Sequence, residues 1–375
     1  MQIPRIYANL GEYLKPNKVL VIFGSRQVGK TTLLEKFLSK IPLKYKLDSG
    51  DNIKTREILS SEDFSRIKEY VSGYELIAID EAQRIPRVGQ GLKIIVDQIK
   101  GIKVIVTGSS SFELAGQIGE PLTGRKRTLA MYPVSQLELK NIYNPYELKE
   151  RLSKWLVFGG YPAVITAGAK DEKTEALEEI VNSYLLKDIL ELEKIKGSKI
   201  IIDLLRLLAF QIGSEVSLSE LAGRLAIDYK TVGRYLDLLE KSFIIVNIRG
   251  FSRNLRKEIN KKSKYYFIDN GIRNAVISNF NGLELRDDAG KLWENFIVIE
   301  RLKVQAYKNI ISNNYFWRTW DKKEIDWVEE REGKLFGYEI KWRDKPVKAP
   351  ADWLKTYAKS SFEVINKENY LEFIT

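Results

Sequence analysis

Eight residues near the start of the chain have the types and the spacing of a loop that binds nucleotide phosphates. Residues 24–31 read Gly-Ser-Arg-Gln-Val-Gly-Lys-Thr. Backbone N–H groups of such a loop, and of the helix that follows it, donate hydrogen bonds to phosphate oxygens. Lys30 would reach the β- and γ-phosphates, and Thr31 would bind Mg²⁺. The predicted nucleotide-binding residues are Gly24, Ser25, Gln27, Val28, Gly29, Lys30, Thr31 and Thr32.

The segments on either side of this loop support that interpretation. Residues 19–23 read Val-Leu-Val-Ile-Phe, which is typical of a buried parallel strand, and residues 32–38 have apolar side chains at helical spacing. A strand before the loop and a helix after it are the context that a phosphate loop requires. A strand-to-helix turn that binds nothing is the alternative. We therefore expect ATP and Mg²⁺ as ligands.

A second apolar run ends in two acids. Residues 76–79 (Leu-Ile-Ala-Ile) are followed by Asp80 and Glu81. A buried parallel strand would bring both carboxylates to the C-terminal edge of the sheet, where open α/β folds bind their ligands. Asp80 would hold Mg²⁺, and Glu81 would polarise the attacking water. An acidic strand end followed by a solvated turn is the alternative.

A third apolar run, residues 103–107, leads into a serine-rich segment. A polar side chain at the tip of this strand would sense the γ-phosphate or orient the water. Ser109 and Ser110 are the candidates for this catalytic role, with Thr107 as a third. A plain turn is the alternative, since serine is common in turns.

Basic residues follow at 124–127, which read Gly-Arg-Lys-Arg. A guanidinium that reaches the γ-phosphate of a neighbouring subunit accelerates hydrolysis. Arg125 is the first candidate for this arginine finger and Arg127 the second, while a solvated basic turn is the alternative. A finger of this kind would place the active site between subunits, so a homo-oligomer is expected, with a hexameric ring as one arrangement.

The composition restricts the chemistry that remains. The chain has no cysteine and no histidine, which excludes disulfides, thiolate metal sites, serine–histidine triads and imidazole bases. Hydrolysis must use carboxylates, lysine, hydroxyls and hard metal ions such as Mg²⁺ or Mn²⁺. The most apolar stretch, residues 200–210, contains Asp203 and Arg206 and predicts a core helix rather than a membrane span. Residues 1–5 lack the apolar core of a signal peptide, so a cytoplasmic protein without a membrane partner is expected.

Positive charge is concentrated in one segment. The chain has a net charge of +11, and residues 249–264 contain seven Lys or Arg against one Glu, which is +6 of that total. Apolar runs at 243–248 and 264–268 flank this segment, so it is predicted to be the wing between two strands. Such a wing would neutralise the phosphates of a polyanion.

Two short helices before the wing complete the pattern of a winged helix. Ser217 and Glu220 form a predicted capping box, and Asp228 caps a second helix, about 229–241, after a short turn. This second helix would enter a major groove, with Tyr235 among its more exposed residues. Its exposed face has no Asn or Gln, so DNA binding without sequence specificity is expected. A winged helix that contacts only proteins is the alternative. The predicted DNA-binding residues are Lys230, Arg234, Arg249, Arg253, Arg256, Lys257, Lys261 and Lys262.

The C-terminal part contains acids at strand spacing. Alternation places Asp326 on the same face as Glu324 in one strand, and Glu339 on the same face as Lys341 in the next. Pairing of these strands would bring Asp326 diagonally beside Glu339. Metal-dependent phosphodiester hydrolysis could then use Asp326 and Glu339 as ligands of Mg²⁺ or Mn²⁺, and Lys341 to orient or deprotonate water. Glu294, in a helix that begins near residue 290, would complete the ligand set. A half-exposed hairpin without catalytic activity is the alternative.

Taken together, these motifs resemble the prokaryotic AAA+-like (ASCE) P-loop ATPases that end in a domain of unknown function related to PD-(D/E)xK nucleases. The resemblance covers essentially the whole chain. It is carried by residues 24–32, 79–84, 107–111, 124–125, 158–162, 265–271 and 293–295, and by Asp326 with Glu339 and Lys341. It implies an ATPase core, a winged helix and a restriction-endonuclease-like C-terminus.

The expected fold is therefore α/β. It comprises a parallel-sheet P-loop NTPase core at 1–140, a helical lid or linker at 141–198, a winged helix at 199–282 and a restriction-endonuclease-like α/β domain at 283–375. The expected function is an ATP-hydrolysing motor or remodeller that acts on DNA, with nuclease activity in the C-terminal domain as a further expectation. One alternative is an ATP-gated regulatory protein with an inert C-terminal domain. The other is a switch ATPase that binds protein partners.

Overall fold

The computed structural model describes most of the chain. The described residues are 3–109, 118–119, 121–185, 198–251, 263–319, 323–344, 347–357 and 359–375. Six predicted site residues lie outside these ranges, namely Ser110, Arg253, Arg256, Lys257, Lys261 and Lys262.

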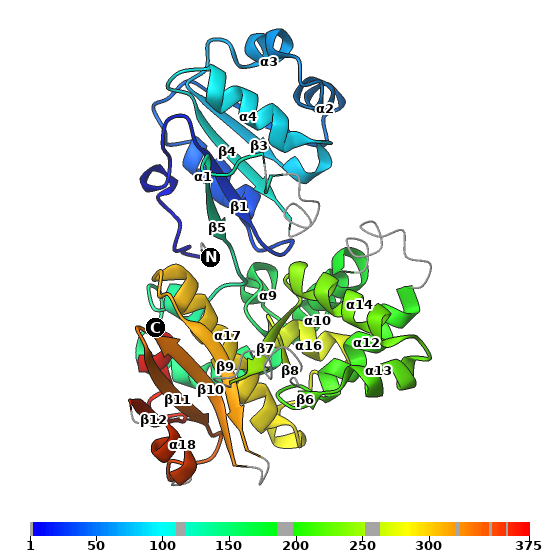
Figure 1. Ribbon diagram of the computed structural model, residues 1–375, viewed down its shortest axis with the longest axis vertical. Coiled ribbons are helices and arrows are strands. Elements are labelled where there is room, and N and C mark those ends of the chain that lie inside the picture. The colour runs from blue at the N-terminus through cyan, green and yellow to red at the C-terminus, as the bar shows by residue number, and fades with distance from the viewer. Residues whose placement is uncertain are drawn as a thin grey trace.

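The N-terminal part is built on a parallel sheet. Its five strands among the described residues have the order β2-β3-β4-β1-β5, and every pair is parallel. The strands are β1 (Val19–Phe23), β2 (Tyr45–Ser49), β3 (Leu76–Asp80), β4 (Lys103–Gly108) and β5 (Lys126–Ala130). Because β4 lies between β1 and β3, its C-terminal tip lies between the predicted phosphate loop and Asp80. The expected P-loop NTPase core is therefore present (Figure 1).

Helices cover both faces of this sheet. Leu20 and Ile22 of β1 pack in one core with Leu34, whereas Val19 and Val21 pack in another with residues of the opposite helical layer. This alternation of two buried faces explains why β1 is apolar throughout. The helices of this part are η1 (Leu10–Glu12), α1 (Lys30–Leu38), α2 (Ile53–Ser60), α3 (Phe64–Val71), η2 (Ala82–Arg84) and α4 (Val88–Gln98).

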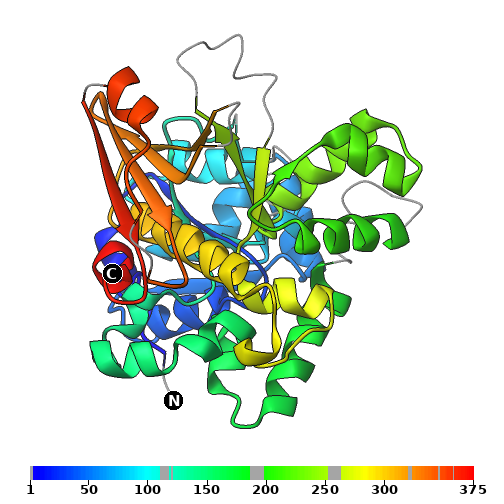
Figure 2. The same cartoon turned by 90° about the horizontal axis from the view of Figure 1, so that it is seen from below.

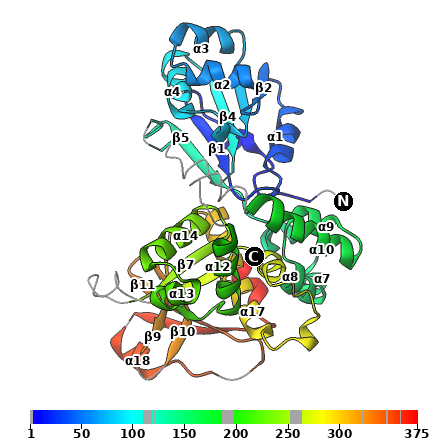
Figure 3. The same ribbon diagram turned by 90° about the vertical axis from the view of Figure 1, so that its right-hand side faces the viewer.

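A helical region follows the first sheet. Its helices are α6 (Gln136–Leu139), α7 (Pro145–Glu150), α8 (Leu152–Phe158), α9 (Pro162–Thr166), α10 (Lys170–Glu179), the π-helix η3 (Ile180–Leu185) and α12 (Ser198–Phe210). In Figure 3 this region and the remaining elements form a second layer below the N-terminal sheet.

The two helices predicted from their caps are present. They are α13 (Leu218–Leu225) and α14 (Tyr229–Lys241). The Ser217 side chain accepts a hydrogen bond from Glu220 N, and the Asp228 side chain accepts from the first turn of α14. The prediction of an exposed Tyr235 is wrong, because this side chain is only 7% exposed and packs in the core.

A mixed sheet joins the middle and C-terminal parts. Within the described residues its strand order is β12-β11-β10-β9-β7-β8-β6. Strands β7 and β9 pair in parallel, so residues assigned to the predicted units 199–282 and 283–375 belong to one sheet. Its strands are β6 (Glu215–Val216), β7 (Ile245–Gly250), β8 (Ser263–Phe267), β9 (Asn313–Arg318), β10 (Glu324–Arg331), β11 (Lys334–Ile340) and β12 (Ser360–Ile365).

The long helix α17 (Ala289–Tyr307) runs through the centre of this second layer. Figure 2 shows α17 in yellow between the orange-to-red strands and the green helices. Its apolar residues, such as Trp293 and Ile297, pack in the C-terminal core with Trp327 of β10. The remaining helices are α16 (Asn270–Val276), η4 (Leu283–Leu285), α18 (Ala351–Thr356) and α19 (Tyr370–Ile374). None of the helices within the described ranges combines the length and the apolar character needed to cross a membrane.

Candidate functional site

The phosphate loop connects the end of β1 to the start of α1. Gly24 has a φ of +149°, and a Cβ at this position would lie 1.9 Å from the carbonyl oxygen of Met131. Gly29 is the N-cap of α1 and has a φ of +93°. Both positions therefore require glycine. Of the other predicted binding residues, Val28 is buried, whereas Gln27 and Thr32 are exposed. A nucleotide could therefore contact the side chains of Gln27 and Thr32, but only the backbone of Val28.

Lys30 lies inside the loop. Its side chain is almost fully buried, and Nζ donates hydrogen bonds to the carbonyl oxygens of Gly24 at 2.9 Å and Ser25 at 2.7 Å. The ammonium group therefore contacts neutral acceptors of the loop itself. Phosphate oxygens, which carry negative charge, would be stronger acceptors for the same group.

Thr31 and the β3 acid are brought together. Thr31 Oγ1 donates to Asp80 Oδ2 at 2.8 Å, and Thr107 Oγ1 donates to the other carboxylate oxygen of Asp80. A hydroxyl and a carboxylate side by side are the hard oxygen donors that Mg²⁺ prefers. The residues present therefore fit a Mg²⁺ ion held by Thr31 and Asp80. Thr107, the third candidate at the tip of β4, is the one that contacts Asp80.

Glu81 is held by a residue that the motif analysis did not single out. Glu81 has a left-handed backbone with φ +50°, a conformation that costs energy outside glycine and is frequent at functional sites. Gln83 Nε2 donates to Glu81 Oε2, and Gln83 Oε1 accepts from Ser109 N at 3.3 Å. The predicted catalytic residues Glu81 and Ser109 are thus linked through Gln83. Gln83 lies within the segment 79–84 that carries the family resemblance, but its link to Ser109 could not be predicted, because it depends on the contact between the ends of β3 and β4.

Arg5 is a second residue that sequence analysis missed. Its guanidinium donates to Val28 O in the phosphate loop at 2.8 Å and to Tyr132 O at 2.7 Å. It also pairs with the buried carboxylate of Glu138 at 2.9 Å. Arg5 and Glu138 are 133 positions apart, so no spacing rule in the sequence could have linked them. Arg5 fixes the position of the loop backbone at Val28.

Arg125 is not brought to the phosphate loop of its own chain. It precedes β5, and the first residue of β5 pairs with Val19 at the start of β1, whereas the loop follows the end of β1. Arg125 Nε contacts Asp97 Oδ1 at 2.5 Å. The other candidate finger, Arg127, lies over the ring of Tyr13 at 4.5 Å. Arg125 therefore lies at the N-terminal end of the strands, whereas the phosphate loop of the same chain lies at their C-terminal end.

Three of the predicted DNA-binding residues are described, and all three are exposed. Lys230 and Arg234 lie on α14, and Arg249 lies on β7. Tyr229, next to Lys230, is 57% exposed. The described part of this surface is therefore basic, with an aromatic ring at its edge.

The predicted C-terminal residues converge. Strands β10 and β11 are antiparallel with Trp327 opposite Tyr338, so one step further Asp326 lies opposite Glu339, directly and not diagonally as predicted. Lys341 Nζ contacts Glu339 Oε1 at 2.5 Å and Asp326 Oδ2 at 3.8 Å. Glu294, on α17, reaches the same place and accepts a hydrogen bond from Tyr266 OH at 2.7 Å.

Lys264, which sequence analysis counted only as a wing residue, completes this group. Its side chain is 2% exposed, and Nζ contacts Glu294 at 3.5 Å, Asp326 at 3.9 Å, and Glu324 more closely. We call Lys264, Glu294, Glu324, Asp326, Glu339 and Lys341 the C-terminal charge cluster. Four carboxylates and two ammonium groups therefore meet where β8, α17, β10 and β11 come together.

Burial and mutual repulsion shift the titration of this cluster. Burial, and then the charge of Asp326, raise the pKa of Glu294 to about 7 and that of Glu339 to about 7. Burial also raises the pKa of Asp326. Burial by itself lowers the pKa of Lys264, but the surrounding carboxylates outweigh it and raise that pKa above its ordinary value. Near neutral pH the two glutamates are therefore partly protonated while Lys264 stays charged.

The cluster in this arrangement does not fit a metal ion. Its carboxylates are suitable ligands for Mg²⁺ or Mn²⁺, but the ammonium of Lys264 already contacts three of them. In the part of the chain that the structure describes, no three acidic side chains are arranged so that they could hold a metal.

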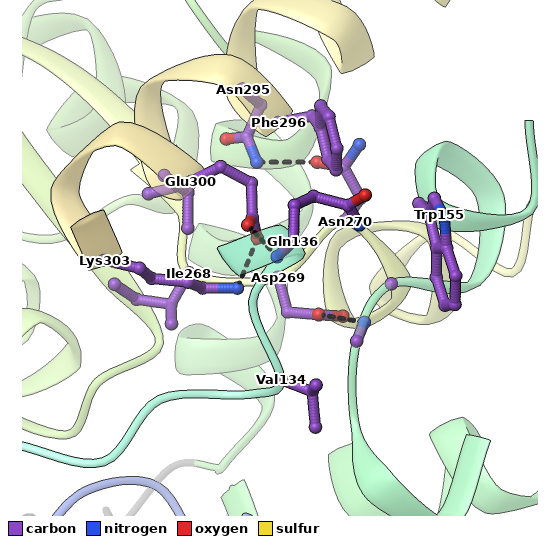
Figure 4. A pocket seen from close by; sticks show the side chains of 13 residues that line it. Val134, Gln136, Trp155, Ile268, Asp269, Asn270, Asn295, Phe296, Glu300 and Lys303 are labelled. Atoms are coloured by element: carbon purple, nitrogen blue, oxygen red, sulfur yellow. Dashed lines mark hydrogen bonds and ion pairs between the residues drawn. The ribbon is translucent and has the colours of Figure 1, made fainter. Parts of the chain in front are cut away.

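A small hollow lies beside the long helix, at the junction of the helical region with the second sheet (Figure 4). Its walls contain the motifs at 158–162, 265–271 and 293–295. Asp269 accepts from Gly160 N at 2.7 Å, and Asn295 Nδ2 donates to Asn270 Oδ1 at 2.7 Å. A Cβ on Gly159 would lie 1.9 Å from Asp269 Oδ1. These motifs thus bind three segments to one another, which accounts for their residue types without a ligand.

Comparison with known proteins agrees with the N-terminal architecture. Residues 16–140 match a family model described as an AAA domain. These residues form an AAA-type ATPase core, whose fold implies a nucleotide and a divalent metal. Residues 149–283 and 289–368 match two domains of unknown function, DUF8612 and DUF4143.

Three uncharacterized relatives align with most of the chain. An uncharacterized protein of Mycobacterium tuberculosis is 29% identical over 346 residues, which is 90% of this chain and 74% of the relative. One of Haemophilus influenzae is 26% identical over 86% of this chain and 82% of the relative. One of Methanocaldococcus jannaschii is 25% identical over 96% of this chain and 88% of the relative.

Solved structures are less similar. A RuvB mutant of Thermotoga maritima is 17% identical and covers 61% of this chain and 81% of its own, with a TM-score of 0.28. A STAND ATPase with a tetratricopeptide repeat sensor from Pyrococcus horikoshii is 16% identical and covers 77% of this chain and 44% of its own, with a TM-score of 0.27.

Proposed function

We propose that this chain is an ATP-hydrolysing, DNA-binding motor or remodeller of the AAA+ type that works in the cytoplasm. The observation that carries the proposal is the meeting of Lys30, Thr31 and Asp80 at the C-terminal edge of the parallel sheet. Lys30 and Thr31 lie in the first turn of α1, directly after the loop, and Asp80 ends β3, which is where a triphosphate on the loop would need them.

Each residue of the nucleotide site would have a separate role in ATP hydrolysis. When bound, Mg²⁺ would neutralise charge on the phosphate oxygens, and Thr31 and Asp80 are the residues that would hold it. Lys30 would exchange its bonds to the Gly24 and Ser25 carbonyls for bonds to phosphate oxygens. Glu81 would orient the attacking water, and Gln83 would control the direction of its carboxylate.

A contact from the loop to the predicted winged helix supports transmission of the nucleotide state. Ser25 Oγ donates to the carbonyl oxygen of Phe243 at 3.1 Å, and the rings of Phe23 and Phe243 meet edge to face at 5.3 Å. Phe243 lies between α14 and β7, the two elements that carry the described basic residues. A shift of Ser25 when phosphate binds would therefore reach this surface directly.

The exposed charges support a nucleic-acid partner. Lys230, Arg234 and Arg249 are exposed, and the net charge of the whole chain is +11. Such surfaces bind phosphates without reading the bases. DNA bound without sequence specificity is therefore the proposed partner.

The test is the rate of ATP hydrolysis with and without single-stranded, duplex and branched DNA. We expect DNA to raise the rate, and Lys30→Ala or Glu81→Gln to abolish hydrolysis. Two results together would favour the switch ATPase that binds proteins. The rate of ATP hydrolysis would be the same with and without each DNA, and the double variant Lys230→Ala/Arg234→Ala would bind DNA as tightly as the wild type. A chain that neither binds nor hydrolyses ATP would defeat the proposal as a whole.

We also propose a homo-oligomer in which Arg125 acts on the neighbouring subunit, for which a hexameric ring is one arrangement. The position of Arg125 at the edge opposite its own loop supports this role. Mixing inactive Lys30→Ala subunits with inactive Arg125→Ala subunits should restore part of the ATPase rate, because one interface then has an intact loop and an intact arginine. Absence of any recovery at equal mixing would count against shared sites.

Metal-dependent cleavage of DNA by the C-terminal charge cluster is a second candidate function, and it would require Lys264 to leave the carboxylates that it contacts in this arrangement. Its support is the convergence of Glu294, Asp326, Glu339 and Lys341 from three elements. The expected result is cleavage in Mg²⁺ or Mn²⁺ that Asp326→Ala and Lys341→Ala abolish. Lack of cleavage with intact ATP hydrolysis would favour the alternative of an ATP-gated regulator with an inert C-terminal domain.

A further inference from the structure

Lys264 is a buried cation among acids that belong to two other elements, α17 and β10. It lies on β8, Glu294 lies on α17, and Glu324 and Asp326 lie on β10. Lys264 Nζ is within 3.9 Å of a carboxylate oxygen of each of these three residues. Its Nζ also lies over the ring of Phe316, 5.3 Å from the ring centre. An aromatic ring and three carboxylates therefore surround the ammonium group.

A metal ion bound by the cluster would need the oxygens that Lys264 already contacts. A divalent cation requires several carboxylate oxygens within about 2 to 2.6 Å. An ammonium group in contact with the same oxygens would lie only a few ångströms from that ion, and two cations so close in a poorly solvated site repel each other strongly. Lys264 and a bound metal are therefore competitors for the same carboxylates.

The cluster nevertheless retains an acceptor that its lysines do not use. Glu339 is 8% exposed, and its Oε2 atom is buried without a hydrogen-bond partner among the described residues. Buried carboxylate oxygens normally have a partner. The other oxygen of Glu339 pairs with Lys341, so the unsatisfied atom is available to an additional cation.

We propose that Lys264 is the resident cation of the C-terminal charge cluster: it holds Glu294, Glu324 and Asp326 together and excludes a divalent metal while it remains there. Lys264 is therefore a positioning residue that sets the metal affinity of the cluster. This inference goes beyond the proposed nuclease function, because it is argued from the contacts of Lys264 and does not require DNA cleavage.

The test is a Mn²⁺ titration of full-length, nucleotide-free protein followed by electron paramagnetic resonance of the free ion. Every arm carries Thr31→Ala, which removes a metal ligand of the nucleotide site. We expect Lys264→Met to bind Mn²⁺ about tenfold or more tightly than the parent, because a competing charge has been removed. Lys264→Arg keeps the charge and should bind like the parent.

A matched control separates this effect from the general loss of a buried lysine. Lys303 is also buried and pairs with Glu300 at 2.7 Å, away from the cluster. Lys303→Met should therefore leave Mn²⁺ affinity unchanged. Adding Glu339→Gln to Lys264→Met should remove the gain, since the unsatisfied carboxylate would be lost.

Equal affinities of the parent and Lys264→Met would overturn the inference, and so would an equal gain in Lys303→Met or in Lys264→Arg. If circular dichroism shows that Lys264→Met does not fold, Lys264→Gln gives the same test with a hydrogen-bond donor retained for Glu324. ATP hydrolysis and DNA cleavage by the wild-type chain are measured separately. Their absence would defeat the proposed functions and leave the Mn²⁺ result standing.

Discussion

The two candidate sites each contain a buried lysine, but the surroundings of the two lysines differ. Lys30 contacts the neutral carbonyl oxygens of Gly24 and Ser25. Lys264 contacts the carboxylates of Glu294, Glu324 and Asp326. A phosphate can therefore attract Lys30 away from its partners, whereas removal of Lys264 would leave buried acids without compensation.

Lys30 can therefore bind a ligand, whereas Lys264 stabilises the fold. The nucleotide loop is a continuous segment whose backbone is arranged by its own glycines and by Arg5. The C-terminal charge cluster has no such continuous segment, and its geometry depends on the packing of α17 against β8, β10 and β11. Four predictions test this comparison.

The largest effect is expected on stability when Lys264 is replaced. Lys264→Met should lower the free energy of unfolding by about 3 kcal/mol or more at pH 8, because breaking a buried ion pair leaves uncompensated charge. Lys30→Met should lower it by less, about 1 to 2 kcal/mol, since the hydrogen bonds to the Gly24 and Ser25 carbonyls are lost. Urea unfolding of both variants gives the comparison. Equal losses would show that the two lysines do not differ as described.

Replacement of Lys30 should have its effect on catalysis instead. Lys30→Ala is expected to lower the rate of ATP hydrolysis by about a hundredfold or more, because a charge that stabilises the transferring phosphate is lost. The exposed Lys40, just after α1, is the matched control, and Lys40→Ala should hydrolyse ATP at the wild-type rate. A Lys30→Ala rate within about twofold of wild type would contradict the assigned site.

The pH dependence of stability should come from the cluster. The pKa of Glu294 is raised to about 7 in the folded chain, so the folded state keeps a proton that the unfolded state releases above about pH 4.5. Its contribution to stability is therefore present below that pH and is lost as the pH rises through 7. We expect the free energy of unfolding to fall by roughly 2 kcal/mol between pH 5 and pH 8.

Urea unfolding across this range checks the prediction in two variants. Glu294→Gln should flatten the dependence, because glutamine does not titrate and can still accept the hydrogen bond of Tyr266. Glu372→Gln changes an exposed acid of α19 and should keep the wild-type slope. An unaltered slope in Glu294→Gln would assign the pH dependence to other groups.

The smallest effect is expected where the two parts of the molecule meet. Phe243→Ala removes the ring that packs against Phe23 and Tyr132. The basal ATPase rate should stay within about twofold of wild type, while stimulation by DNA should fall several-fold, because the ring contacts that join Phe243 to Phe23 and Tyr132 are lost and only the hydrogen bond from Ser25 to the Phe243 carbonyl remains. Phe210, which is 64% exposed on α12, provides the control Phe210→Ala. Full stimulation in Phe243→Ala would mean that the nucleotide state is transmitted elsewhere.

Features set by neighbouring residues could be predicted from the sequence. The apolar run at 19–23, the glycines at 24 and 29, and the caps Ser217 and Asp228 all act within a few positions. The parallel core, the loop and the two helices α13 and α14 follow from such local patterns. Tyr235 was predicted on the wrong side of its helix because α14 has polar and apolar residues near the boundary of its buried face.

Features that depend on distant contacts could not be predicted. Nothing around Arg5 indicates Val28 O or Glu138 as its partners, and nothing around Gln83 indicates Ser109. The spacing of Asp326 and Glu339 predicted that they would meet, but the direct pairing was settled by the strand register. Lys264 was counted only among the basic residues of a wing, since its acidic partners lie at 294, 324 and 326.

The amino-acid sequence by itself thus determined which chemistry is available: a glycine-rich loop with lysine and threonine, acids at strand ends, and no histidine or cysteine. The tertiary structure alone decided which charges face one another. The reason is physical: backbone conformation responds to adjacent residues, whereas the balance of a buried charge depends on every element packed around it. The pairing of β7 with β9 and the position of α17 bring Lys264 to its three acids and thereby form the C-terminal charge cluster.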